Sequence, residues 1–204
     1  MNQTPSIDFN QRAKGWDANP AHADRNRAII AALGGHVALD GTLTALELGC
    51  GTGDLALGLA PSLASILATD ASAGMVEQFA AKLAANPQAN VRAVCFDLLA
   101  DGSLTETFDL VYSAMMLHHV VDVAGLLVRI VSRLRPDGQL ALVDLLTEDG
   151  SFHAEMPVPH RGFSEPELGM LARAAGLRLR SFEVIHAVAK NDRQYPVFLA
   201  MLGA

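Results

Sequence analysis

Apolar and polar positions alternate in blocks along most of the chain from residue 43 onward. Short apolar runs predict buried β-strands over 43–48, 64–70, 91–96, 108–113 and 139–146. Between them, apolar residues recur at helical spacing over 76–83 and 123–134, and a further helix is expected over 54–60. Strands that alternate with helices in this way predict a parallel, doubly wound α/β sheet with right-handed crossovers.

The N-terminal part of the chain predicts two helices before the first strand. Residues 1–8 are expected to be a loose tail, and a short helix follows from Phe9 to Trp16. After a break at Asn19-Pro20, a second helix runs to about Leu33 and ends at Gly34-Gly35. The two helices either form a lid over the carboxyl edge of the sheet or cover one of its faces, and both interpretations stay open.

The C-terminal part changes in character after the fifth strand. Ser164 and Glu167 predict a capping box for a helix that ends near Gly176. Two apolar runs, 177–189 and 195–202, are joined by a short polar turn and predict an antiparallel hairpin. We therefore expect one domain over 1–204, made of a helical lid (1–36), a core (37–146) and a final section with a substrate loop, helix and hairpin (147–204).

Composition narrows the class of protein. Half of the 204 residues are hydrophobic and 18% are charged, as in ordinary globular domains. The net charge of −7 disfavours a nucleic-acid-binding surface, because the 15 basic residues are scattered. Two distant cysteines predict neither a disulfide framework nor a cysteine-based zinc site. No apolar run reaches membrane-spanning length and no leader is recognisable, so a cytoplasmic protein is expected.

The glycine-rich stretch after the first strand is the first candidate for chemistry. Gly49, Gly51 and Gly53 stand at every second position between a strand and a helix start. In such a loop the backbone can approach a ligand closely, and helix N–H groups point at it. A tight turn without a ligand is the alternative, and the residues that follow other strands decide between the two.

Carboxylates stand where these strands end. Asp70 lies 21 positions after Gly49, where it can accept hydrogen bonds from both hydroxyls of a ribose or serve as a helix N-cap. Asp97 follows the third strand and can accept from the exocyclic amine of a base or act as a turn carboxylate. Glu47 lies inside an apolar strand, where a buried charge needs a partner, which favours a ligand with a positive amine.

Together these motifs resemble those of class I S-adenosylmethionine-dependent methyltransferases. The matching segments occur in the family's order between about 43 and 146, and they are 47–53, 69–75, 95–98, 108–113, 117–120 and 134–140. The terminal hairpin also matches. Within the family, the chain is most similar to small-molecule methyltransferases of the quinone-biosynthesis type.

The resemblance implies a Rossmann-like, seven-stranded sheet with strands 1–5 parallel, a C-terminal antiparallel hairpin and an N-terminal helical lid. It also implies transfer of a methyl group from S-adenosylmethionine to O, N or C of a small organic acceptor by direct in-line displacement, which leaves S-adenosylhomocysteine. A non-catalytic or regulatory module that binds S-adenosylmethionine is an alternative. An NAD-dependent oxidoreductase is disfavoured because the glycines follow a GxGxG pattern. No nucleic-acid or membrane partner is expected, and monomer and homodimer both stay open.

The resemblance also assigns roles to particular residues. Glu47 would hold the amino end of the cofactor, Asp70 the ribose, and Asp97 the adenine amine. Trp16 and Phe9 in the lid would shield the sulfonium or simply pack, and a structural role is favoured for the Cys50 side chain. The full set of expected cofactor-binding residues is Glu47, Gly49, Cys50, Gly51, Gly53, Asp70, Ala71, Met75, Asp97, Leu98, Ser113 and Trp16.

Histidines are the candidates for acid–base chemistry. His118 follows the fourth strand and is the preferred general base, with loop packing or helix capping as the alternative. His153 and His160 lie after the fifth strand, where substrate residues are expected. Their spacing matches no recognisable metal-ligand pattern, so no metal is expected.

Overall fold

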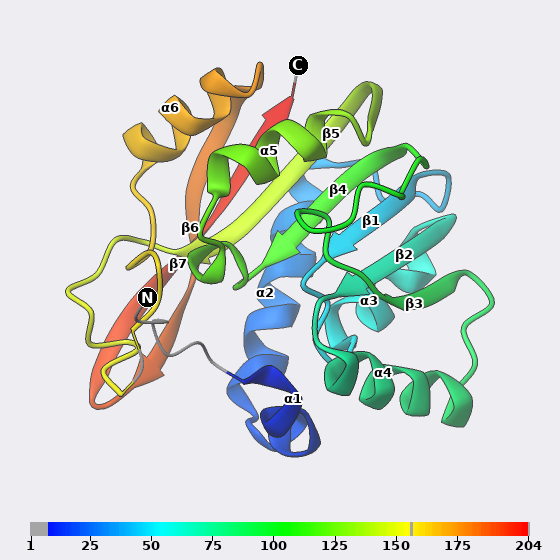
Figure 1. The fold of residues 1–204 in the computed structure, drawn as a ribbon, viewed down its shortest axis with the longest axis horizontal. Coiled ribbons are helices and arrows are strands. Elements are labelled where there is room, and N and C mark those ends of the chain that lie inside the picture. The colour runs from blue at the N-terminus through cyan, green and yellow to red at the C-terminus, as the bar shows by residue number, and fades with distance from the viewer. Residues whose placement is uncertain (1–7, 156, 204) are drawn as a thin grey trace.

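A seven-stranded sheet forms the centre of the protein. The computed structural model describes residues 8–155 and 157–203 (Figure 1). The strand order is β3-β2-β1-β4-β5-β7-β6, and the strands are β1 (Thr44–Leu48), β2 (Ser65–Asp70), β3 (Val91–Cys95), β4 (Phe108–Ala114), β5 (Leu134–Leu145), β6 (Arg178–Lys190) and β7 (Arg193–Gly203). The first five strands are parallel, and β7 pairs antiparallel with both β5 and β6. The predicted fold class is confirmed.

Helices cover both faces of the sheet, so its strands are apolar on both sides. The described helices are α1 (Phe9–Arg12), α2 (Ala21–His36), α3 (Asp54–Leu59), α4 (Ala73–Ala85), α5 (Val123–Val131) and α6 (Glu165–Ala174), with short 3-10 helices η1 (Ala13–Ala18), η2 (Ala60–Ser62) and η3 (Leu117–His119). Helices α2, α3 and α4 pack on one face, and α5 and α6 on the other. None of the described helices combines the length and hydropathy that a membrane crossing requires.

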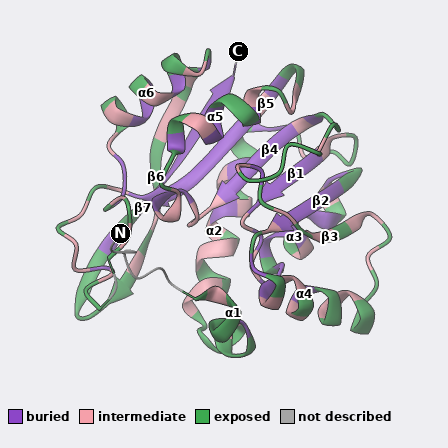
Figure 2. Ribbon diagram, viewed as in Figure 1, coloured by how far each residue is buried: buried purple, intermediate pink, exposed green. Residues whose placement is uncertain are grey.

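Side chains alternate between two cores along each strand, as the period of two demands. In β4, Leu110 and Tyr112 join the core beneath α2–α4, whereas Val111 joins the core beneath α5 and α6. The central strands are buried along nearly their whole length (Figure 2). Their carboxyl ends meet at one edge, where parallel sheets place their ligands.

Several boundaries differ from the sequence prediction, and α5, for example, ends at Val131 instead of Leu134. Helix α2 continues through Gly34-Gly35 to His36, because Ile29 and Leu33 are buried in the core and packing outweighs the low helix propensity of glycine. Strand β5 begins at Leu134, not at 139. The turn expected over 136–138 lies inside the strand as an irregularity that shifts its register against β4.

The sequence left open whether the N-terminal helices form a lid or cover a sheet face, and the structure assigns one role to each part. Helix α2 covers a sheet face, whereas α1 and η1 lie at the carboxyl edge. Asn10 Oδ1 accepts hydrogen bonds from Ser72 Oγ at 2.9 Å and Gly74 N at 2.8 Å, at the start of α4. Asp17 Oδ1 accepts from Thr52 Oγ1 at 2.5 Å. The segment α1–η1 is therefore the lid. The expected tail over 1–8 lies almost wholly outside the described residues.

The third glycine of the loop allows helix α4 to pack closely. Gly53 has a φ of +85°, and a Cβ there would lie 2.3 Å from the Phe79 ring. We predict that Gly53→Ala lowers the free energy of unfolding by about 2–4 kcal/mol, from left-handed backbone strain plus overpacking. Urea unfolding measures this. Gly35→Ala is the matched control, since an added Cβ there meets nothing within 4 Å, and a loss as large as that of Gly53→Ala would contradict the packing argument.

Candidate active site

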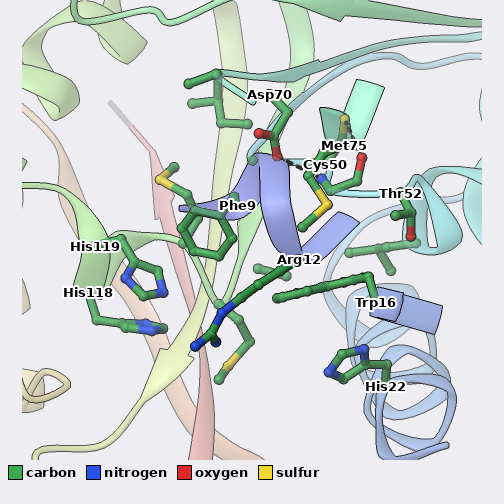
Figure 3. A pocket seen from close by; sticks show the side chains of 18 of the residues that line it. Phe9, Arg12, Trp16, His22, Cys50, Thr52, Asp70, Met75, His118 and His119 are labelled. Carbon is green, nitrogen blue, oxygen red and sulfur yellow. Dashed lines mark hydrogen bonds between the residues drawn. The ribbon is translucent and has the colours of Figure 1, made fainter. Parts of the chain in front are cut away.

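A cavity of about 1090 Å³ lies beneath the lid at the carboxyl edge of the sheet (Figure 3). It is lined by the lid, the glycine loop, the ends of β1, β2 and β4, the η3 segment, the loop after β5 and the tip of the β6–β7 hairpin. Its volume is at the upper end of the range of small-molecule sites, about 300–1,000 Å³. The cavity is therefore large enough for a nucleoside-sized ligand together with a second small molecule.

Asp70 holds the glycine loop in place. Its Oδ2 accepts a hydrogen bond from Gly51 N and its Oδ1 accepts from Ser72 N, both at 2.8 Å. The N-cap of α4 is Ser72, whose Oγ accepts from Met75 N, so Asp70 does not cap the helix itself. Burial raises the pKa of Asp70, and the two backbone hydrogen bonds oppose that shift. The carboxylate lines the cavity and is half-buried there.

The three loop glycines all adopt left-handed conformations, with φ values of +70°, +54° and +85°, and they face different neighbours. A Cβ on Gly49 would lie 2.5 Å from the Met116 side chain, whereas one on Gly51 would lie 3.7 Å from Trp16 Nε1. Gly49 and Gly51 line the cavity, and Gly53 does not. Gly53 thus serves packing, a role that the spacing of the glycines does not distinguish from ligand contact.

Glu47 is buried at the opposite end of the loop. Its side chain lines the cavity, and Tyr112 Oη donates a hydrogen bond to Glu47 Oε2 at 3.1 Å. Burial raises the pKa of Glu47 from an ordinary 4.5 to about 8, and the tyrosine hydrogen bond opposes the rise. Tyr112 was missed by the sequence analysis, because the pairing of Glu47 with Tyr112 depends on the register between β1 and β4.

The remaining expected residues fall into three groups. Ala71, Met75 and Leu98 line the cavity beyond Asp70, and Cys50 lines it within the loop, where burial raises the pKa of its thiol. Asp97 also lines the cavity, but its Oδ1 accepts from Leu99 N at 2.8 Å and Ala100 N at 3.4 Å, as a turn carboxylate does. Ser113 is buried outside the lining, and its Oγ has no hydrogen-bond partner among the described residues.

Aromatic side chains of the lid close the cavity above the loop. The rings of Trp16 and Phe9 meet edge to face at 6.0 Å between centroids, and Trp16 lies 5.0 Å from the His22 ring. All three residues line the cavity (Figure 3). Phe9 also meets His119 edge to face at 5.1 Å, so the lid reaches from the glycine loop to the η3 segment.

His118 is buried and held by a carboxylate. Its Nδ1 lies 2.6 Å from Asp144 Oδ1, and its backbone N–H donates to Asp144 Oδ2 at 3.1 Å. Its Nε2 lies 3.1 Å from His153 Nε2, and the His119 ring stands next to both. The His160 N–H donates to the His118 carbonyl, but the His160 side chain lies apart, against Phe163. Asp144, at the end of β5, was also missed by the sequence analysis.

Burial lowers the basicity of the other two imidazoles. The pKa of His119 falls to about 3, with burial as the main cause and His118, His153 and Arg12 adding to it. The pKa of His153 falls to about 4, again mainly through burial, with His118 and Lys190 as further causes and Asp144 opposing. Both rings are therefore neutral at pH 7 and offer lone pairs to the cavity.

Comparison with known proteins finds methyltransferases similar to the central part of this chain. A family model described as a methyltransferase domain matches residues 45–138. The chain is 35% identical to the trans-aconitate 2-methyltransferase of Deinococcus radiodurans over 63% of its own length and 47% of that protein. The residues that the family model matches include β1 to β4 and the glycine loop, whereas the lid, the loop after β5 and the β6–β7 hairpin lie outside them. Over this central part the chain is similar to methyltransferases.

Solved structures confirm the methyltransferase fold. The structure of DhpI in complex with S-adenosylhomocysteine has a TM-score of 0.73 at 22% identity and covers 96% of this chain and 92% of that one. A putative methyltransferase in complex with the Trm112 methyltransferase activator, from Haloferax volcanii, has a TM-score of 0.81 at 17% identity and covers 98% and 99%. The chain spans about half the length of the curated relatives it matches.

Glu47 should make the stability of this domain depend on pH. Between pH 4.5 and about 8 the folded state keeps the Glu47 proton that the unfolded state has released, so the contribution of Glu47 to the free energy of unfolding falls as pH rises through that window. His119 and His153, whose pKa values are lowered, contribute in the opposite direction below pH 6.5, so the comparison is between wild type and a Glu47 variant. The limiting slope is about 1.4 kcal/mol per pH unit. We predict that Glu47→Gln, which stays neutral, removes this fall in ligand-free protein.

Urea unfolding at a series of pH values tests the prediction. Glu77→Gln, at an exposed position on α4, controls for the loss of a carboxylate. If wild type and Glu47→Gln lose stability in parallel between pH 5 and pH 8, the buried carboxyl group is not the cause.

Proposed function

We propose that this chain transfers a methyl group from S-adenosylmethionine to a small organic acceptor by direct in-line displacement. The observation that carries the proposal is the arrangement of Asp70, Gly51 and Glu47 around one cavity, with one carboxyl group at each end of the glycine loop. The family match over 45–138 supports it. For the whole chain we propose the division expected from the sequence into sections 1–36, 37–146 and 147–204, with the difference that within 1–36 only α1–η1 serves as the lid and α2 covers the sheet.

The residues present fit S-adenosylmethionine. Asp70 would accept hydrogen bonds from the ribose hydroxyls, since it faces the cavity while keeping its bonds to the loop. Glu47 would pair with the amino group, which compensates for the desolvation that now raises the pKa of its carboxyl group. The apolar Ala71, Met75 and Leu98 would contact the adenine, and Asp97 its amine. Ser113, which lies outside the lining, is not needed for this arrangement.

The chain would accelerate the reaction mainly by positioning and by excluding water. S-adenosylmethionine supplies a methyl group that its sulfonium already activates. Alignment of two bound reactants lowers a barrier by roughly 7–11 kcal/mol at the ideal limit. Trp16 and Phe9 would close the cavity above the glycine loop. His118 would act on the acceptor through Nε2, because Asp144 occupies Nδ1 and fixes the orientation of the ring.

We further propose that the acceptor is an anion. Arg12, Arg25 and Lys190 line the cavity, although the chain as a whole carries a net charge of −7. Arg12 and Lys190 lie close enough to the histidines to lower their pKa values, and Arg25 lies close enough to interact with Asp144 behind His118. The Arg25 Nε is buried without a hydrogen-bond partner among the described residues. The Arg12 guanidinium points toward His118 and His119 (Figure 3). One relative is named for trans-aconitate, a tricarboxylate, and this favours a carboxylate acceptor. The quinone-type acceptor expected from the motifs stays a prediction.

Binding of S-adenosylhomocysteine tests the cofactor site directly. We predict that isothermal titration detects binding by wild type and that Asp70→Asn weakens it by about tenfold or more, because charge-assisted hydrogen bonds contribute about 1.5–3 kcal/mol. Asp101→Asn, an exposed aspartate outside the cavity, is the control. Absence of binding by wild type at millimolar concentration would refute the proposed function. Unchanged affinity in Asp70→Asn would remove Asp70 from the site. Binding without methyl transfer to any acceptor tested would favour a regulatory module.

The charge of the acceptor is tested with a panel of carboxylates, including trans-aconitate, beside uncharged alcohols and phenols. We predict that Arg25→Met raises KM for a carboxylate acceptor about tenfold or more and leaves that for an uncharged acceptor unchanged, since methionine keeps the apolar stem without the charge. Arg27→Met, on the exposed side of the same helix, is the control. Equal effects on charged and uncharged acceptors would contradict an anion-binding role.

A further inference from the structure

Three imidazole rings converge at the acceptor side of the cavity. His118 and His119 come from η3, and His153 comes from the loop after β5. The ring centroids are separated by 4.0 Å for His118 and His119, 5.1 Å for His118 and His153, and 5.3 Å for His119 and His153. One nitrogen from each ring lies within 4.8 Å of the other two. Three imidazole nitrogens thus lie around one small volume.

Asp144 prepares one of these donors. Its carboxylate accepts from the His118 Nδ1 at 2.6 Å and from the His118 backbone N–H at 3.1 Å, and both residues are buried. With the proton held on Nδ1, the Nε2 lone pair of His118 is directed toward the other two rings. A carboxylate behind a histidine is also the usual outer partner of a metal-bound imidazole, because it fixes the ring and raises its basicity.

We propose that His118, His119 and His153 bind a divalent transition-metal ion of the Zn²⁺ type. Imidazole nitrogens suit Zn²⁺, Co²⁺ and Ni²⁺, and three protein ligands leave a coordination position free, as in catalytic zinc sites. The sequence did not predict this site: only His153 and His160 were considered as ligands, and no metal was expected from their spacing. The fold brings His153 to the adjacent histidines of η3, and His160 stays apart.

A hydrogen bond between His118 and His153 is the competing explanation of their 3.1 Å separation. That bond requires an N–H donor on residue 153 and does not involve His119. The metal site requires all three rings. Arg12 and Lys190 lie near the same rings and oppose the charge of the ion, so an anion would be favoured as the fourth ligand. On this model His118 is a ligand and the ion acts on the acceptor, a consequence that rests on the proposed function.

The test is metal binding by untagged protein after dialysis against a chelator. We expect one Co²⁺ per chain with the visible absorption of a nitrogen-ligated tetrahedral or five-coordinate ion, and displacement of Co²⁺ by Zn²⁺. His119→Ala and His153→Gln should each weaken Co²⁺ and Zn²⁺ binding by at least tenfold. Glutamine at 153 keeps a donor for His118 Nε2, so it preserves the competing hydrogen bond. His186→Ala, which lies outside the cluster, is the control and should bind as wild type does.

The proposal is overturned if wild type binds no Co²⁺ or Zn²⁺ at stoichiometric concentration, or if His119→Ala and His153→Gln bind as tightly as wild type. Circular dichroism and titration with S-adenosylhomocysteine check that each variant is folded with an intact cofactor site. Because metal binding is measured without methyl transfer, its failure is distinguishable from failure of the proposed function. Metal binding by a protein that does not bind S-adenosylhomocysteine would support the metal site alone.

Discussion

The bond between the Asp70 carboxylate and the Gly51 N–H is the constraint on which the cavity depends. It ties the glycine loop after β1 to the end of β2, and the second oxygen of Asp70 fixes Ser72 at the start of α4. The lid is attached to the same place, since Asn10 binds Ser72 and Gly74. Two strand ends and a helix start therefore share one carboxylate, and the lid is joined to them through Ser72, so that the shape of the loop and closure over it are mechanically linked.

Charge is sorted within the cavity. Glu47 and Asp70 flank the glycine loop, whereas Arg12, Arg25 and Lys190 lie near the histidines or near their carboxylate partner. On the proposed function, the first region would favour the cationic S-adenosylmethionine and the second an anionic acceptor. Electrostatics would then distinguish the two reactants before any shape selection. Glu47 supports the fit of the cofactor in the first region, because its desolvated carboxyl group would be stabilised by the ammonium group of the cofactor.

The fold could be predicted because its signals are local. Apolar runs set the strands, helical spacing set α4 and α5, and Gly49 to Gly53 marked the strand-to-helix loop. Failures came where tertiary packing decides. Helix α2 runs through Gly34-Gly35 because its buried residues outweigh propensity. The bulge in β5 was assigned to a turn because its pairing with β4 leaves no local signal.

The residues of the site were likewise predictable only where their sequence signal is local. Glu47, Asp70 and Asp97 could be selected because each stands at a strand end in a fixed order, although Asp97 also satisfies its own turn. Tyr112 and Asp144 could not, since their importance arises from register and from contact across 26 to 65 positions of sequence. The histidine cluster is the extreme case. His118 and His119 are adjacent in sequence, and the pair gains a third ring only because the loop after β5 folds back over η3, held by the hydrogen bond from His160 N to the His118 carbonyl. That backbone contact means that the loop shapes the acceptor side of the cavity as much as the sheet does. On the proposed function, the choice of acceptor can therefore change with the loop while Asp70 and the glycine loop stay fixed.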